Sequence, residues 1–437
     1  MKKKTIQFIT LGCSKNLVDT EKLLGQLSAD RFDVVPEGEG MADMVVVNTC
    51  GFIQDAKEES INTILEVLEA RKQGMVREVI VTGCLSERFR DELKQEIPEV
   101  DAWFGVHDQG DLFDYLQEHY HDDSPERFIT TPGHYAYLKI AEGCDRSCSF
   151  CVIPMIRGPY VSRPVDQLVD EATRLARKGV KELILVAQDL TYYGQDLEKK
   201  PMLASLLKEL VKVDGIEWIR LHYAYPNRFP EEVLQLMVAE PKICNYLDIP
   251  LQHINDLVLQ SMRRGHGKKQ VLDFMHKLRQ QYPEVAIRTT MMVGFPGETD
   301  AAFQELMDFI NEIRFERLGV FTYSPEEDTT ALTMGNTVAE KVKQQRADAI
   351  MNRQSEISES LNQAKSGKSY RVIVDREEQD YFVGRTEYDS PEVDNEVFIE
   401  KAPDIQPGRF VQVTILHAGE HELYATVQDG SASSPIE

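Results

Sequence analysis

The amino-acid sequence predicts an α/β multidomain protein with three parts: a doubly wound parallel-sheet N-terminal domain in residues 1–125, a partial (βα)6 barrel in residues 130–365, and a C-terminal, five-stranded, OB-like β-barrel in residues 367–437. Three observations lead to this prediction. Strand-like and helix-like segments alternate as far as residue 365, which is typical of parallel sheets. Only short strand-like segments follow. The chain has 437 residues, more than one hydrophobic core usually holds.

In the N-terminal part, three apolar, strand-like segments each end beside a cysteine. The segments are 5–10, 44–47 and 78–81, and the cysteines are Cys13, Cys50 and Cys84. Apolar residues at helical spacing predict helices between them, over 18–27 and 54–71. Ligands of a doubly wound sheet gather beyond the carboxyl ends of its strands. The three cysteines should therefore converge on one site, although one buried cysteine alone would be a core residue.

The central part repeats the alternation with six strands. The predicted strands are 137–141, 182–186, 218–223, 246–249, 286–293 and 318–323. The helical segments between them include 167–177, 202–213, 270–281 and 301–313. Six strands in right-handed succession predict an open barrel whose site lies at the carboxyl ends of the strands.

A second group of cysteines follows the first of these strands. Cys144, Cys148 and Cys151 form a C-x3-C-x2-C pattern. A 4Fe-4S cluster normally takes four thiolates, so three close cysteines indicate a cluster with one iron open for chemistry. A structural zinc with a distant fourth ligand, His134 or His222, stays a second interpretation, although zinc ligands usually come in closely spaced pairs. Cys244 lies in no such setting and is expected in the core.

The C-terminal part follows a polar helical stretch, 338–365, and consists of five predicted strands. They are 370–374, 381–385, 396–399, 410–416 and 422–427. Turn-forming residues separate them, which fits a small barrel. From residue 368 onward there are 6 lysines and arginines against 15 aspartates and glutamates, a net charge of −9. This charge disfavours RNA binding by the barrel.

The whole chain is acidic, with 49 lysines and arginines against 73 aspartates and glutamates and a net charge of −24. A surface of this sign repels phosphate backbones and attracts basic proteins. No apolar run reaches the roughly 18 residues of a membrane span, and the N-terminal segment lacks the apolar core of a signal peptide. Seven cysteines are an odd number, so we expect a cytoplasmic protein with reduced thiols and no membrane partner.

All three parts together resemble the methylthiotransferase family: a domain with three spaced cysteines, a radical S-adenosylmethionine (SAM) core and a TRAM domain. Three motifs resemble the enzymes that modify a ribosomal protein more than those that modify tRNA. The segment 10–19 reads TLGCSKNLVD, where the tRNA enzymes usually show Gly-Cys-Gln-Met-Asn. The segment 186–194 reads VAQDLTYYG, where they usually have Gly-Gln-Asn-Val. The segment 323–329 carries glutamates where they tend to have arginine.

This resemblance implies two 4Fe-4S clusters and SAM as cofactors. Cys144, Cys148 and Cys151 would hold the cluster that cleaves SAM to a 5'-deoxyadenosyl radical. Cys13, Cys50 and Cys84 would hold an auxiliary cluster that carries the sulfur, which a second SAM methylates. The radical would remove a hydrogen atom from the β-carbon of an aspartate in small-subunit ribosomal protein S-twelve, which then receives the methylthio group. Implied partners are this basic protein, free or in the small ribosomal subunit, and an electron donor such as flavodoxin or ferredoxin.

No side chain is expected to act as acid or base, because hydrogen-atom transfer needs positioning and exclusion of water. Eight residues are candidates for contacts with SAM or with the substrate: Phe150, Arg157, Ser162, Arg163, Gln188, Asp189, Gly294 and Gly297. Core packing or surface ion pairs would explain several of them equally well. Two other functions stay open at this point: a tRNA adenosine methylthiotransferase, and a non-catalytic acidic adaptor on the ribosome with structural metal sites. No direct nucleic-acid substrate is expected.

Overall fold

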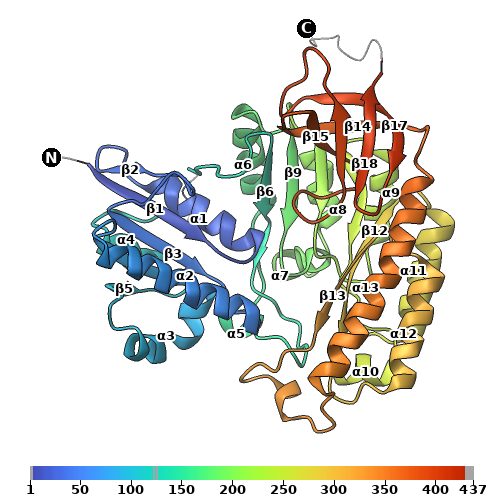
Figure 1. Cartoon of the computed structure of the whole chain (residues 1–437), viewed down its shortest axis with the longest axis horizontal. Coiled ribbons are helices and arrows are strands. Elements are labelled where there is room, and N and C mark those ends of the chain that lie inside the picture. Colours follow the sequence, from blue (N-terminus) through green and yellow to red (C-terminus); the bar gives the residue numbers. More distant parts are fainter. Residues whose placement is uncertain (1–2, 122–123, 125, 429–437) are drawn as a thin grey trace.

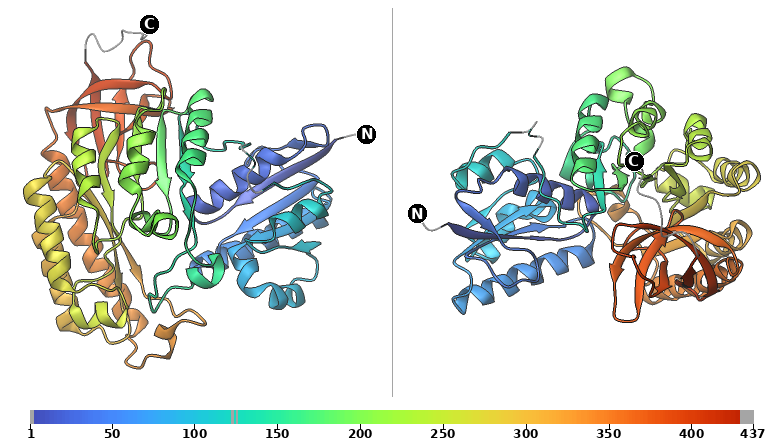
Figure 2. Two further views of the ribbon diagram at one scale, coloured as in Figure 1. Left: turned by 180° about the vertical axis from the view of Figure 1, so that it is seen from behind. Right: turned by 90° about the horizontal axis from the view of Figure 1, so that it is seen from above.

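The protein is described by a computed structural model that covers residues 3–121, 124 and 126–428. Figure 1 shows three bodies: an N-terminal α/β domain beside a larger α/β core, and a small β-barrel stacked on one end of that core. The views in Figure 2 show the same arrangement from behind and from above. The predicted limit at residue 130 lies between α4 (Gln109–Tyr115) and β6 (Tyr135–Lys139), and those at 365 and 367 lie between α13 (Glu340–Gln363) and β14 (Ser369–Glu377).

The N-terminal domain is a five-stranded parallel sheet with the order β2-β1-β3-β4-β5. Its strands are β1 (Lys4–Thr10), β2 (Phe32–Val34), β3 (Met44–Thr49), β4 (Glu78–Gly83) and β5 (Ala102–Trp103). Helices α2 (Gln54–Lys72) and α3 (Cys84–Glu96) pack against one face of the sheet, and α1 (Ser14–Gln26) and α4 pack against the other. The predicted doubly wound sheet is confirmed.

Two features of this domain differ from the sequence prediction. Helix α1 begins at Ser14, directly after Cys13, although the apolar pattern placed its start at residue 18. The first residues of the helix, Ser-Lys-Asn, are polar and therefore gave no apolar pattern. The positive φ of Gly12 turns the chain from β1 into α1 before residue 18. The short strands β2 and β5 escaped prediction because three and two residues show no periodicity.

The core contains a six-stranded parallel sheet in the order β13-β12-β11-β10-β9-β6. Its strands are β6, β9 (Glu182–Val186), β10 (Trp218–Leu221), β11 (Ile243–Asp248), β12 (Ala286–Val293) and β13 (Arg317–Thr322). Sequential order with β6 and β13 at the two edges gives the predicted open, partial barrel. A two-stranded sheet of β7 (Ala141–Glu142) and β8 (Val161–Ser162) lies beyond the end of β6.

Six helices of the core pack against this sheet through the large hydrophobic cluster: α6 (Val165–Arg177), α8 (Leu203–Leu210), α9 (Glu231–Ala239), α11 (Lys268–Gln281), α12 (Asp300–Ile313) and α13. The connections after the strands contain the short helices α5 (Ile153–Arg157), α7 (Gln195–Glu198) and α10 (Asp256–Ser261) and the 3-10 turns η1 (Leu190–Tyr192) and η2 (Thr330–Thr333). Of these, α5 packs against the N-terminal domain beside Cys84. The large cluster joins the six helices to the strands. It anchors the loops at the carboxyl ends of the strands.

The C-terminal body is a closed five-stranded barrel with the order β14-β15-β16-β18-β17. Its further strands are β15 (Tyr381–Thr386), β16 (Glu396–Glu400), β17 (Phe410–Ala418) and β18 (Glu422–Val427). Alternate residues of β14, β16 and β17 point inward and are buried, which is the period of two that strands impose. The predicted five-stranded barrel is confirmed.

Buried ion pairs join the C-terminal barrel to the core. Arg385 pairs with Glu182 at 2.7 Å, and Glu182 also pairs with Arg220 at 2.7 Å. Arg317, the first residue of β13, pairs with Asp389. Because Glu182 is likewise the first residue of β9, the barrel closes the amino ends of these strands and leaves their carboxyl ends for the site. No helix among the described residues is both long and apolar enough to cross a membrane.

Candidate active site

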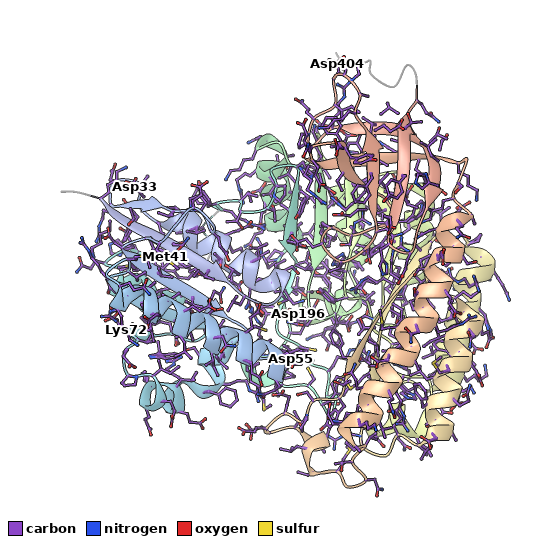
Figure 3. All side chains as sticks on the ribbon, viewed as in Figure 1. Asp33, Met41, Asp55, Lys72, Asp196 and Asp404 are labelled. Atoms are coloured by element: carbon purple, nitrogen blue, oxygen red, sulfur yellow. The ribbon has the colours of Figure 1, made fainter. Side chains whose placement is uncertain are left out.

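Both groups of cysteines line one cavity of about 390 Å³, at the junction of the N-terminal domain and the core. The six are Cys13, Cys50, Cys84, Cys144, Cys148 and Cys151. Figure 3 shows this junction filled with side chains, with Asp55 on the N-terminal domain and Asp196 on the core labelled near it. Asp33 and Met41 lie at the far end of the N-terminal domain. The structure therefore brings Cys13, Cys50 and Cys84 together, as predicted. The second trio lines the same cavity.

Sequence features of the N-terminal domain place the first trio. Cys13 precedes α1, Cys50 follows β3, and Cys84 begins α3 directly after β4. Gly12 has φ +86°, and a Cβ atom there would come within 2.6 Å of the Cys50 Cβ atom. Gly12 is thus needed for both its backbone conformation and the close approach of two cysteine-bearing segments.

The second trio lies in the loop between β7 and α5. The Cys144 N–H donates to the Gly158 carbonyl at 3.1 Å, and the Cys151 N–H donates to the Cys148 carbonyl at 3.2 Å. Gly143 has φ +71°, and a Cβ atom there would lie 2.0 Å from the Pro159 carbonyl oxygen. These contacts define the path of the loop that carries the three cysteines.

The surroundings of the thiols fit iron–sulfur ligation. All cysteines of the chain are free thiols, and thiolates are the donors that such clusters take. Burial raises the pKa of Cys50 and of Cys151 to about 12 and that of Cys144 to about 11. For Cys13, burial is outweighed by the cations Lys15 and Arg157, which lower its pKa. Because metal binds the thiolate form, the raised pKa of Cys50, Cys144 and Cys151 couples metal loading to proton release.

The zinc interpretation finds no support in the positions of its proposed fourth ligands. The His134 ring lies 2.7 Å from the Asp375 carboxylate, and the His222 ring lies 2.8 Å from the Ser390 hydroxyl, both at the interface with the C-terminal barrel. Neither lines the cavity. Within the described ranges, no three His, Cys, Asp or Glu side chains, those of either cysteine trio included, are grouped closely enough to hold a single metal ion. Cys244 is 1% exposed beside Trp218, so its predicted place in the core is confirmed.

Four of the eight predicted supporting residues line the cavity: Phe150, Arg157, Gln188 and Asp189. Arg157 donates from Nη1 to the Asp19 carboxylate at 2.8 Å and from Nη2 to the Cys84 sulfur at 3.5 Å. Asp189 accepts from the Arg146 guanidinium at 2.6 Å and from the Thr191 N–H at 2.9 Å.

The other four are not among the residues that line this cavity. The Ser162 hydroxyl donates to Asp196 at 2.6 Å, so Ser162 faces α7. Arg163 pairs with Glu171 at 2.7 Å. Gly294 has φ +76°, and a Cβ atom there would meet the Lys343 side chain, whereas one at Gly297 would meet open space. For these four, contacts with SAM or with the substrate stay predictions.

Several lining residues escaped the sequence analysis, among them Lys15, Arg146, Tyr223, Tyr225 and Arg264. Lys15 and Arg146 lie two residues after Cys13 and Cys144 in the sequence. This short separation from predicted cluster ligands could have identified them as residues of the site. Tyr223, Tyr225 and Arg264 come from loops after β10 and α10 and carry no motif. Arg264 nevertheless donates to the Cys148 sulfur at 3.4 Å.

Comparison with known proteins assigns each domain to a described family. Residues 138–310 match the radical SAM superfamily, residues 5–105 the uncharacterized protein family UPF0004, and residues 367–427 the TRAM domain. The ribosomal protein uS12 methylthiotransferase RimO of Christiangramia forsetii is 54% identical over 437 residues, which cover all of this chain and 97% of that protein. The RimO of Phocaeicola vulgatus is 48% identical over 98% of this chain and all of that protein. This chain belongs to the RimO family of radical SAM methylthiotransferases.

Solved structures of other radical SAM enzymes share the fold of this RimO family member. The radical SAM methyltransferase TsrM from Kitasatospora setae has a TM-score of 0.52 at 14% identity, over 74% of this chain and 77% of that one. The cobalamin-dependent radical SAM enzyme OxsB has a TM-score of 0.51 at 13% identity, over 82% of this chain and 56% of that one. Both support the fold alone.

Proposed function

We propose that this chain transfers a methylthio group to the β-carbon of an aspartate in ribosomal protein uS12. One observation carries the proposal: two separate trios of cysteines, one from each of two domains, line a single cavity. A cavity with one trio would suit SAM cleavage alone. The second trio adds a site for a sulfur donor within reach of the same substrate atom, and relatives that match over the full chain bear the name of uS12 methylthiotransferase.

Each cysteine trio would hold one iron–sulfur cluster. Cys144, Cys148 and Cys151 would hold one 4Fe-4S cluster together with SAM, and Cys13, Cys50 and Cys84 would hold the other. When bound, these groups supply the carbon-centred radical and the methylated sulfur. An electron donor such as flavodoxin or ferredoxin and two molecules of SAM complete the requirements.

The chain's own side chains position the reactants and keep water out. Asp189 is 2% exposed and fixes the Arg146 guanidinium, which lies 4.0 Å from the centroid of the Tyr225 ring. These three side chains form part of the cavity wall on the radical SAM side. Removal of water protects a radical that would otherwise react with solvent.

The charge of the molecule suits a basic protein substrate. The chain carries −24 overall, so a strongly basic ribosomal protein would be attracted and a tRNA repelled. The C-terminal barrel, with −9, contributes to this field.

Mass spectrometry tests the proposal. The reconstituted enzyme, with SAM and a reductant under anaerobic conditions, should add a methylthio group to purified uS12 and leave bulk tRNA unmodified. A Cys13→Ala, Cys50→Ala, Cys84→Ala variant should still cleave SAM but modify nothing. Modification of tRNA in place of uS12 would contradict the proposal.

A further inference from the structure

Apart from the cysteines, the charged side chains that line the cavity are mostly cationic. Its lining holds four cationic side chains and one carboxylate, Asp189. The cations are Lys15, Arg146, Arg157 and Arg264. Buried cations usually have an anionic or hydrogen-bonding partner. A cation in this cavity that has no such partner within the protein is therefore a candidate for binding a ligand.

Three of the four are engaged within the protein. Arg146 pairs with Asp189 at 2.6 Å. Arg157 pairs with Asp19 at 2.8 Å and with Glu142 at 3.2 Å. Arg264 donates to the Pro250 carbonyl at 2.6 Å and to the Cys148 sulfur at 3.4 Å, which holds it on the radical SAM side.

Lys15 is the exception. Its side chain is buried, with 5% of the residue exposed, and its Nζ atom lies 3.7 Å from the centroid of the Tyr223 ring. In the part of the chain that the structure describes, no hydrogen bond or ion pair engages this ammonium group. An aromatic face offers it only part of the stabilisation that water would give.

The backbone of Tyr223 is held in an unusual conformation that keeps this ring below Lys15. Tyr223 has φ +64°, a region that residues with a side chain rarely adopt and that often marks a functional site. Its N–H donates to the Asp248 carboxylate at 3.2 Å, and its carbonyl accepts from the Leu190 N–H at 3.1 Å. The ring is thus a fixed platform, and the ammonium group above it has a fixed place in the cavity.

We propose that Lys15 binds the side-chain carboxylate of the substrate aspartate and so fixes the adjacent β-carbon between the two cysteine trios. This rests on the proposed function, since it names the group that selects that substrate. For an ammonium group that makes no hydrogen bond or ion pair, a carboxylate supplies both an acceptor and the opposite charge, whereas an amide or a nucleobase supplies an acceptor alone. The motif contrast agrees, because the tRNA enzymes usually have methionine at the position of Lys15.

Binding measurements on the reconstituted holoenzyme test this assignment. Wild-type enzyme, Lys15→Met, Lys15→Arg and the exposed control Lys4→Met are compared with uS12 and with uS12 in which the target aspartate is replaced by asparagine. Lys15→Met should weaken the binding of native uS12 by roughly 30-fold and leave the binding of the asparagine form almost unchanged. Lys15→Arg should recover part of the affinity, and Lys4→Met should match wild type.

Two readouts separate substrate binding from loss of structure. The iron content and the SAM cleavage rate without uS12 are measured for every variant, and binding is compared per iron-loaded enzyme, because Lys15 also lowers the pKa of Cys13. Lys15→Gln provides the same comparison if Lys15→Met loses iron. Equal weakening for both forms of uS12, or no weakening for either, would overturn the role of Lys15 while native uS12 is still modified by wild type. Wild-type enzyme that neither binds nor modifies native uS12 would overturn the proposed function and this assignment together.

Discussion

The guanidinium of Arg157, from the core, lies 3.5 Å from the sulfur of Cys84, from the N-terminal domain. The same guanidinium donates to Asp19 at 2.8 Å, and Asp19 belongs to α1 of the N-terminal domain. One buried side chain therefore bridges both domains at the wall of the cavity. This contact joins the two cysteine-bearing domains next to the cavity, together with the ion pairs of Glu326 with Lys57 and Arg88.

Replacing Arg157 with methionine should destabilise the docking of the two domains. The change leaves the carboxylates of Asp19 and Glu142 with Lys139 as their remaining cation, and loss of one member of a buried ion pair costs about 3 kcal/mol. Thermal unfolding measures the effect. The exposed pair of Lys208 and Glu232 supplies the control, since Lys208→Met should change stability by less than about 1 kcal/mol. Equal effects of both variants would refute a bridging role.

The two trios should load iron independently. Anaerobically reconstituted wild-type protein should bind about eight iron atoms, and a Cys144→Ala, Cys148→Ala, Cys151→Ala variant about four. The matched triple variant of Cys13, Cys50 and Cys84 should also bind about four, whereas Cys244→Ala should match wild type because Cys244 is a core residue. Metal analysis and absorption spectra give the numbers. Zinc in place of iron, or a wild-type content of four irons, would contradict the assignment.

The free energy of unfolding should decrease as the pH is lowered, over a pH range determined by Glu171. Burial opposes ionisation of Glu171, but Arg163 and Arg127 outweigh it and lower its pKa to about 2. A carboxyl group with a depressed folded pKa contributes stability above the unfolded value of about 4.3, and that contribution is lost as pH falls toward 2. Between pH 7 and pH 4 the loss should be about 1 kcal/mol.

Urea unfolding of wild type and of Glu171→Gln at these two pH values checks this prediction. The variant should be less stable at pH 7, and its pH dependence should be smaller by about the same 1 kcal/mol. An unchanged slope in Glu171→Gln would show that other carboxylates dominate the acid sensitivity.

Most of the fold was predictable because buried parallel strands produce continuous apolar runs. The bounds of β9 and β12, Glu182–Val186 and Ala286–Val293, are those that the sequence predicted. The convergence of Cys13, Cys50 and Cys84 followed from the rule that strand ends of a parallel sheet share an edge. These features depend on local pattern and on topology, both of which the sequence contains.

The remaining walls of the cavity were not predictable in the same way. Tyr223 and Arg264 enter from separate loops, and their relation to the cysteines depends on how the loops fold across the sheet. Ser162 and Arg163 contact Asp196 and Glu171 and are not among the residues that line the cavity, although they lie near the cysteine loop in sequence. Their contacts with SAM or with the substrate stay predictions.

The C-terminal barrel should depend on Arg385 for its attachment to the core. Arg385 is 2% exposed and pairs with Glu182 and Asp375, both at 2.7 Å. Arg385→Met should lower stability by about 3 kcal/mol and make the junction between α13 and β14 sensitive to protease. The control is Arg376→Met in the same barrel, where the exposed pairs of Arg376 should contribute less than about 1 kcal/mol. Equal protease resistance in both variants would show that other contacts dominate the attachment.

Phe321, on the edge strand β13, should contribute to entry of the substrate. Its side chain lines the cysteine cavity and also a neighbouring groove of about 440 Å³ that includes Asp55 and Met351. The residue is 54% exposed, which is unusual for a phenylalanine in a strand and leaves an apolar contact available to an incoming chain. The carboxylate of Asp55 at the same groove suits a basic segment such as a ribosomal protein carries.

Phe321→Ala should therefore raise the KM for uS12 by about three- to tenfold, because an exposed aromatic contact contributes about 1 kcal/mol to recognition. The free energy of unfolding should change little, since the side chain is already half in water. Leu257→Ala is the matched control, because Leu257 is 73% exposed and does not line either cavity. Steady-state methylthiolation at varied uS12 concentration gives KM and kcat separately. A fall in kcat with unchanged KM would place Phe321 in the reaction step and remove it from substrate entry.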